Sequence, residues 1–305
     1  MSSIVGDTST RRTLAGLAYE VRPWQWYKQS MLLLGIVFSR NILSLAAWTN
    51  VLLAIAAFCA VAGATYIVND ISDREADRNH PVKQDRPIAS GQVIVPVAGV
   101  AAVALLTGGF GVAYLVNTLV FAVLVVYLLQ NVLYSVILKD LVIVDVIVVA
   151  VGFVLRAVAG VVAIGVYLSP WLVVCTFLAA LLLALGKRHH ELIVSDDPGE
   201  TRATLGEYTE SALEQFLVVT LGTLLVAYSL YTFFRATDAM MLTLPFAFYA
   251  AFRYQLLTHT TDVGGDPSRL LTDRAFVVNL VLWGLVAVAV LYRVPQALLA
   301  LGGVS

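Results

Sequence analysis

Long apolar runs, separated by shorter polar segments, fill most of the chain. Because a helix needs about 20 apolar residues to cross the hydrocarbon core of a bilayer, the pattern predicts nine membrane-spanning helices. We expect them at residues 31–49, 50–68, 93–112, 116–137, 141–163, 167–185, 213–234, 239–257 and 275–293. The first run is the weakest, since Arg40 and Asn41 interrupt it.

The composition agrees with a membrane protein and excludes a soluble globular one. Of the 305 residues, 60% are hydrophobic and 13% are charged, whereas soluble domains carry about 25% charged residues; the mean hydropathy is +0.86. We therefore predict an all-α polytopic protein with the lipid bilayer as its solvent. It would be a single domain, residues 1–305, with a polar N-terminal segment at 1–29, a helical bundle at 30–294 and an apolar tail at 295–305. No nucleic-acid partner is expected, and homo-oligomerisation is left open.

The placement of the basic residues predicts the orientation. With the N-terminus in the cytoplasm, 15 of the 19 Lys and Arg residues fall on the cytoplasmic side and three on the other, while Arg156 lies inside a span. This split follows the positive-inside rule for a plasma-membrane protein. It also places the polar loops 69–92, 186–212 and 258–274 in the cytoplasm, so we expect the active site to cap the bundle there.

An acidic motif follows the second apolar run directly. If the helix continues past the membrane surface, Asn69, Asp70, Asp73 and Asp77 stack on one face, three or four residues apart. Like charges at this spacing repel one another, so a cation is needed to offset them. Mg²⁺ prefers oxygen ligands and is commonly held by one or two carboxylates together with substrate phosphates, and Mn²⁺ accepts similar ligands. The plainer alternative is a solvated acidic helix end.

Basic residues near this motif are candidates for binding phosphate. The candidate substrate-binding residues are Lys28, Lys83, Arg86, Tyr134, Arg156, Lys187 and Arg188. Arg grips phosphate with two hydrogen bonds, while Lys acts as a point charge. Ordinary positive-inside charge or helix-end charge would also explain the pairs Lys83/Arg86 and Lys187/Arg188.

Three further features leave alternatives open. Asp145 and Arg156 share the fifth span, and Arg156 either anchors an anion or belongs to a buried polar network. Asp196 and Asp197 are either a second metal site or solvated loop residues. His189 and His190 are adjacent and face different ways on a helix, so a zinc site there is not expected.

Nine spans with the sequence Asn69-Asp70-x-x-Asp73-x-x-x-Asp77 after the second resemble the UbiA superfamily of membrane prenyltransferases, over about residues 20–293. Within it, the chain is similar to the decaprenyl-phosphate phosphoribosyltransferases. The matching segments are Arg22-Pro23-x-Gln25-Trp26-x-Lys28, Arg86-Pro87-Ile88-Ala89-x-Gly91, Leu155-Arg156-Ala157 and Gly186-Lys187-Arg188-x-x-Glu191-Leu192. Lys187 and Arg188 stand near the place where prenyl-diphosphate users carry a second aspartate-rich motif.

The resemblance implies a Mg²⁺-dependent transfer of 5-phosphoribose from phosphoribosyl pyrophosphate to a polyprenyl (decaprenyl) phosphate, in cell-wall arabinan precursor synthesis. Asp73 and Asp77 would be the catalytic carboxylates, and with Asn69 and Asp70 they would hold the metal. One rival is transfer of an isoprenoid from its diphosphate to an aromatic or other acceptor, with Asp196 and Asp197 as the second metal site. Another is a transporter or lipid carrier without chemistry.

Overall fold

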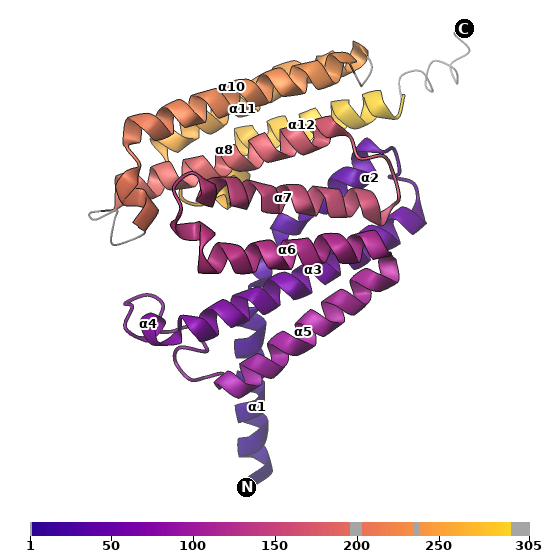
Figure 1. Cartoon of the computed structure of the whole chain (residues 1–305). Coiled ribbons are helices and arrows are strands. Elements are labelled where there is room, and N and C mark those ends of the chain that lie inside the picture. Colours follow the sequence, from indigo (N-terminus) through magenta and orange to yellow (C-terminus); the bar gives the residue numbers. More distant parts are fainter. Residues whose placement is uncertain (1, 196–202, 235–237, 294–305) are drawn as a thin grey trace. The chain divides into compact units, whose positions relative to one another are not determined.

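The computed structural model describes residues 2–195, 203–234 and 238–293, and in this part of the chain all regular elements are helices, joined by turns and loops, without strands (Figure 1). Its α-helices are α1 (Ser2–Glu20), α2 (Leu34–Phe38), α3 (Leu45–Ser72), α4 (Arg74–Arg78), α5 (Val95–Val116), α6 (Thr118–Val136), α7 (Val144–Ala163), α8 (Pro170–Val194), α10 (Glu210–Phe234), α11 (Leu244–Thr260) and α12 (Arg274–Leu291). Short 3₁₀ helices connect them: η1 (Pro23–Leu33), η2 (Leu138–Asp140), η3 (Ala203–Glu207), η4 (Asp238–Thr243) and η5 (Pro267–Thr272).

Seven of the described helices are long and apolar enough to cross a membrane: α3, α5, α6, α7, α8, α10 and α12. The expected count of nine is not confirmed. The predicted span 31–49 is interrupted: α2 ends at Phe38 and α3 begins at Leu45, with Arg40 in the left-handed region between them at φ 62°. The predicted span 239–257 is split between η4 and α11, which has only 17 residues. The side of the membrane that each loop faces stays a prediction.

The chain divides into two compact units. The first comprises residues 1–36, 44–136 and 155–166, and so contains α1, η1, α3–α6 and the C-terminal half of α7. The second comprises residues 37–43, 137–154 and 167–305, and contains the N-terminal half of α7 and the helices from α8 onward.

Small residues let the helices of the first unit approach closely. The buried face of α3 is rich in alanine, and its Ala64 and Ile67 pack with Ala98 and Ala102 of α5. Close backbone packing through small residues is the usual way in which membrane helices associate. The closest approach is at Gly160 of α7, where an added Cβ would lie 1.9 Å from the carbonyl oxygen of Leu32 in η1.

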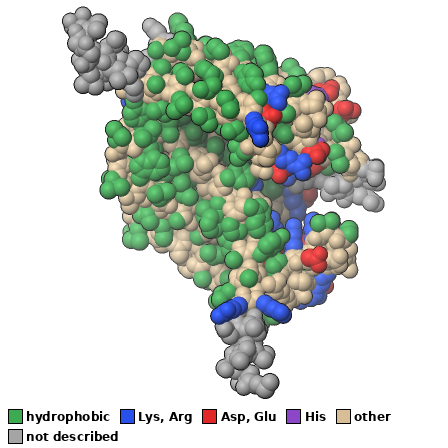
Figure 2. Space-filling view, turned by 180° about the vertical axis from the view of Figure 1, so that it is seen from behind, with side chains coloured by type: hydrophobic (Ala, Val, Ile, Leu, Met, Phe, Trp, Pro, Cys, Tyr) green, Lys and Arg blue, Asp and Glu red, His purple; other side chains and the backbone are tan. Residues whose placement is uncertain are grey.

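Apolar side chains also cover much of the surface that faces outward, as Figure 2 shows for one side of the molecule. On α5 and α6 they include Val100, Leu115 and Leu119, which are 72%, 81% and 62% exposed. Such surfaces are unfavourable in water and are favourable in lipid.

The second unit has its own core, in which Leu182 and Leu185 of α8 pack with Leu213 and Leu217 of α10 and Tyr254 of α11.

Candidate active site

The acidic motif lies where α3 ends and α4 begins. The prediction of one continuous helix is wrong, because α3 stops at Ser72 and Asp73 separates it from α4. The helical pattern of backbone hydrogen bonds nevertheless continues through Asp73. The amide of Asp73 donates to the carbonyl of Asn69, and that of Asp77 to the carbonyl of Asp73, both at 2.8 Å. Asp70 and Asp77 are each 3% exposed, whereas Asp73 is exposed.

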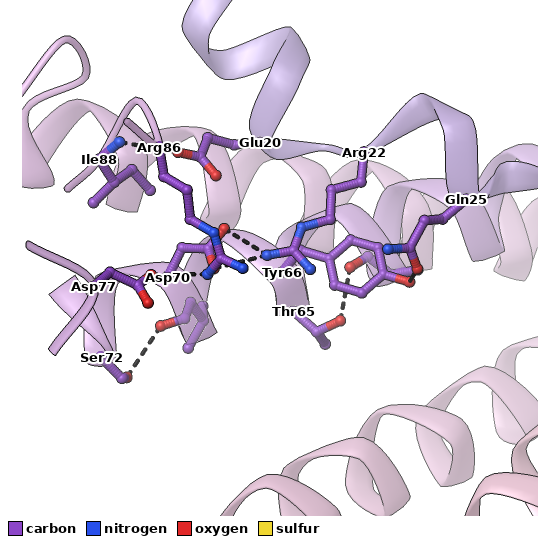
Figure 3. Close-up of polar contacts among 12 residues, drawn as sticks. Glu20, Arg22, Gln25, Thr65, Tyr66, Asp70, Ser72, Asp77, Arg86 and Ile88 are labelled. Atoms are coloured by element: carbon purple, nitrogen blue, oxygen red, sulfur yellow. Dashed lines mark hydrogen bonds and ion pairs between the residues drawn. The ribbon is translucent and has the colours of Figure 1, made fainter. Parts of the chain in front are cut away.

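Two arginines hold the buried aspartates together (Figure 3). Arg86 donates from Nη1 to Oδ1 of Asp70 at 2.9 Å and to Oδ2 of Asp77 at 2.8 Å. Arg22 grips both oxygens of Asp70 through Nη2, at 2.8 and 2.9 Å. The repulsion between the carboxylates is therefore offset by guanidinium groups from two other segments of the chain.

The donor set fits a Mg²⁺ ion. The oxygens of Asp70 and Asp77 that meet at one nitrogen of Arg86 would converge equally on a cation if Arg86 moved away. Two carboxylates with water and phosphate oxygens are the ligands that Mg²⁺ commonly takes. The exposed carboxylate of Asp73 and the amide of Asn69 are one turn or less away along the motif.

A buried carboxylate, Glu20, completes the cluster. Glu20 is 1% exposed, lies at the end of α1, and accepts a hydrogen bond from the amide of Ile88 at 2.9 Å. Burial, and next a hydrogen bond with Asp70, raise the pKa of Glu20 to about 7. Sequence reasoning missed both Glu20 and the role of Arg22. The available signal was the run of charged residues just before the first apolar run.

Lys28 is held close to this cluster by η1. Its Nζ donates to Oε1 of Gln25 at 2.8 Å, and the hydroxyl of Tyr66 donates to the same oxygen at 3.2 Å. Arg22 stacks over the Tyr66 ring, 4.9 Å from its centroid. One turn of α3 separates Tyr66 from Asp70, so Lys28, Arg22 and the acidic motif share one patch of the first unit.

The other predicted residues of the first unit lie in different surroundings. Lys83 is exposed in the loop after α4, and Tyr134 is half-buried on α6. Arg156 is 6% exposed and donates to Oε1 of Gln29 at 2.9 Å and to the hydroxyl of Tyr127 at 2.7 Å. Arg156 is thus part of a buried polar network with Gln29 and Tyr127, one of the two alternatives.

Asp145 belongs to a buried network in the second unit. Arg188 donates from Nε to Oδ2 of Asp145 at 2.7 Å, and the hydroxyl of Tyr208 donates to Oδ1 at 3.1 Å. Arg188 also pairs with Glu191, and its side chain is only 6% exposed. Lys187, by contrast, has a side chain that is 51% exposed and lies 3.7 Å from Glu191. Of the two predicted phosphate ligands, Lys187 is therefore the accessible one.

The structure brings together Asp70, Asp77 and Arg86 from the predicted site and adds Glu20 and Arg22. Asp196 and Asp197 lie outside the described residues. Chemically, the patch offers carboxylates for a divalent cation next to guanidinium and ammonium groups for anionic oxygens. A diphosphate bound with its metal ion satisfies both halves of such a patch.

Comparison with known proteins identifies the family of this chain. Residues 31–280 match the UbiA prenyltransferase family. The decaprenyl-phosphate phosphoribosyltransferase of Corynebacterium glutamicum is 32% identical over 92% of this chain and 88% of its own length. The enzyme of that name from Mycolicibacterium smegmatis is 32% identical over 90% of this chain and 91% of its own.

A similar fold is found in a UbiA homologue from Archaeoglobus fulgidus, whose structure was solved bound to GPP and Mg²⁺. It superposes with a TM-score of 0.70 over 91% of this chain and 99% of its own, at 17% sequence identity. From the family match and the coverage of these relatives, the chain belongs to the UbiA prenyltransferase family.

Proposed function

We propose that this protein transfers 5-phosphoribose from phosphoribosyl pyrophosphate to decaprenyl phosphate and releases pyrophosphate. The observation that carries the proposal is the pair of buried carboxylates, Asp70 and Asp77, held by the partly exposed Arg86 and Arg22, which together offer a cation site and anion donors. The phosphoribosyltransferase relatives, which extend over nearly the whole chain, support this substrate pair.

Binding of the donor would rearrange the ion pairs at the acidic motif. Asp70 and Asp77, assisted by Asn69 and Asp73, would hold Mg²⁺. The bound ion would neutralise the charge that develops on the leaving pyrophosphate. Arg86 would turn from the two carboxylates toward the diphosphate oxygens, which are equivalent partners for its guanidinium group.

The reaction exchanges one bond to the anomeric carbon of the ribose for another. The bond from this carbon to pyrophosphate breaks, and an oxygen of the acceptor phosphate forms the new bond. Because the acceptor phosphate is already an anion at neutral pH, the site needs no strong general base. Its contribution is to position the two substrates and to stabilise charge.

The remaining basic residues have distinct roles in this proposal. Lys28 and Lys83, both in the first unit, would bind phosphate oxygens, and the exposed Lys187 is kept as a candidate phosphate ligand by itself. A basic residue at position 187, near the end of α8, suits a donor that carries a 5-phosphate in addition to its diphosphate. Arg188 and Arg156 are buried and already paired, so we assign them to positioning. Arg188 holds the end of α8 to Asp145, and Arg156 holds η1 through Gln29, the residue after Lys28.

The acceptor's apolar tail requires a membrane location. Exposed apolar side chains on α5 and α6 would lie in the acyl region of the bilayer, and the polar motif would lie at the cytoplasmic surface of the plasma membrane. The product would serve cell-wall arabinan precursor synthesis, the role implied by the resemblance of the chain to this branch of the family.

The proposal is tested with purified protein in detergent, radiolabelled phosphoribosyl pyrophosphate, decaprenyl phosphate and Mg²⁺. Asp77→Asn should lower the label that enters the lipid phase by at least about a hundredfold, a size typical when a group that stabilises transition-state charge is lost. Asp85→Asn, in the exposed part of the following loop, is the matched control and should keep wild-type activity. Equal activity in both variants would contradict the metal assignment.

A second candidate is transfer of an isoprenoid from its diphosphate to an aromatic or other acceptor. The Archaeoglobus fulgidus neighbour, solved with GPP and Mg²⁺, favours testing it. Asp196 and Asp197 would then supply a second metal site. Consumption of a labelled prenyl diphosphate with an aromatic acceptor, by protein that leaves phosphoribosyl pyrophosphate intact, would establish this reaction instead. A transporter without chemistry fits membership of a transferase family poorly.

A further inference from the structure

A second group of potential metal ligands lies in the second unit, away from the aspartate motif along the chain. His189 near the C-terminal end of α8 and Glu210 and Glu214 in the first turns of α10 place one ligand atom each within 4.8 Å of one another. The two helices pack side by side in this unit (Figure 1). Glu210 and Glu214 are four residues apart, so they project from the same face of α10 toward His189.

The buried imidazole of His189 is independent evidence for a bound ligand. The residue is 2% exposed, and its Nε2 is buried without a hydrogen-bond partner among the described residues. The nearest carboxylate oxygen, Oε1 of Glu214, is 4.0 Å away, too far for a hydrogen bond. A buried polar atom without a partner costs about 1–3 kcal/mol, which a bound cation would remove.

One ion fits between these groups once the exposed carboxylates close slightly, since the three ligand atoms lie within 4.8 Å of one another. Zinc binds histidine nitrogen and carboxylate oxygen at about 2.0–2.2 Å, so two ligands of one ion are at most about 4.3 Å apart. The 4.0 Å between Nε2 of His189 and Oε1 of Glu214 lies within that limit. The side chain of Glu214 is 46% exposed and Glu210 is exposed, so both have room to close around an ion.

The ligand types select the kind of metal. Mg²⁺ and Ca²⁺ prefer oxygen ligands only, whereas an imidazole with carboxylates suits Zn²⁺ and related transition metals. Three protein ligands leave a fourth position for water. The imidazole of His259 adds nitrogen close by, with its ring 5.7 Å from that of His189.

We propose that His189, Glu210 and Glu214 form a binding site for Zn²⁺ or a similar transition-metal ion, made of other residues than the proposed Mg²⁺ site at the aspartate motif. The ion ties the end of α8 to the start of α10. These two helix ends bracket the connection that carries Tyr208, which in turn holds Asp145 against Arg188. Adjacent histidines alone predict no zinc site; the site arises because α10 brings two carboxylates to one of them.

The experiment measures Zn²⁺ binding to tag-free, full-length protein in detergent, by competition with a chromophoric zinc indicator. Excess Mg²⁺ is present throughout, so that the aspartate motif is occupied. The wild type should bind one Zn²⁺ per chain, and His189→Ala and Glu214→Gln should each bind it at least about tenfold more weakly, since even loss of an outer-shell partner can cost that much. His190→Ala, the neighbour outside the group, should bind as the wild type does.

Thermal unfolding provides an independent readout. At the same Zn²⁺ concentration, the melting temperature should rise for the wild type and for His190→Ala, and should rise less for His189→Ala and Glu214→Gln. Glu214→Gln is a substitution at a partly exposed position, so it keeps the test valid if His189→Ala does not fold. Equal Zn²⁺ affinity in wild type and Glu214→Gln, or no binding by the wild type, would overturn the proposal.

Discussion

Replacing Arg188 by methionine tests whether this residue holds the structure or binds substrate. The change removes the ion pair that Arg188 makes with the fully buried carboxylate of Asp145. Removing one partner of a buried ion pair costs about 3–5 kcal/mol, because the remaining charge stays buried and loses the attraction of the opposite charge. We expect the free energy of unfolding of Arg188→Met to fall by about this amount.

The double variant separates the two roles. Asp145→Asn combined with Arg188→Met removes both charges, and replacing a buried pair by neutral groups is often nearly neutral. The double variant should therefore regain most of the stability that Arg188→Met loses. Unfolding in detergent, followed by circular dichroism, measures the free energy of unfolding of the wild type, of Arg188→Met and of the double variant. Lys187→Met is the matched control, since its exposed side chain predicts a change in stability within about 0.5 kcal/mol and a higher KM for the donor.

A direct phosphate ligand at Arg188 would give a different pattern. Arg188→Met would then keep its stability and lose transfer activity, and adding Asp145→Asn would restore neither. That result would refute the assignment of Arg188 to positioning.

Two other predictions concern the first unit. The pKa of Glu20 is raised from 4.5 to about 7 in the folded protein, so the folded state binds this proton more tightly than the unfolded state does. The stability that this tighter proton binding gives the folded protein is fully present below pH 4.5 and is lost as the pH rises through 7. In metal-free buffer, unfolding from pH 5 to 8 should show the wild type losing about 1–3 kcal/mol relative to Glu20→Gln, whose amide mimics the protonated carboxyl; parallel curves would contradict this. Gly160→Ala places a Cβ 1.9 Å from the Leu32 carbonyl oxygen and should lower the free energy of unfolding by about 1–3 kcal/mol. Gly108→Ala, whose new Cβ has no atom within 4 Å, is the control and should not lower it when unfolding is measured in the same way.

The sequence predicted the fold well where a single run of apolar residues carries the information. The long runs that became α3, α5, α6 and α10 are visible as continuous apolar segments because a spanning helix satisfies its own backbone hydrogen bonds. The prediction was less accurate where polar groups or proline interrupt a run, as at Arg40 and before α11. Whether such a segment continues as one helix depends on the neighbours that pack against the break, and these are distant in sequence.

The site was predictable in its local part only. The spacing from Asn69 to Asp77 indicates a shared face. The backbone hydrogen bonds continue across the break at Asp73, and Asp70 and Asp77 are both buried while Asp73 is exposed. The partner choices were not predictable, because Arg22 and Asp70 are 48 residues apart. Arg188 and Asp145 are 43 residues apart and Arg156 and Gln29 are 127 apart, so the packing of separate helices decides these pairs. The metal-binding and substrate-binding roles themselves stay predictions until activity is measured.

The most direct test of the central claim is the transfer reaction itself. Purified wild-type protein is incubated with decaprenyl phosphate and radiolabelled phosphoribosyl pyrophosphate, and both the label entering the lipid phase and the pyrophosphate released are counted, with Mg²⁺ or with EDTA. We predict that label and pyrophosphate appear in equal amounts with Mg²⁺ and that EDTA abolishes both. Folded protein that transfers no label to decaprenyl phosphate or to shorter polyprenyl phosphates would contradict the proposed function.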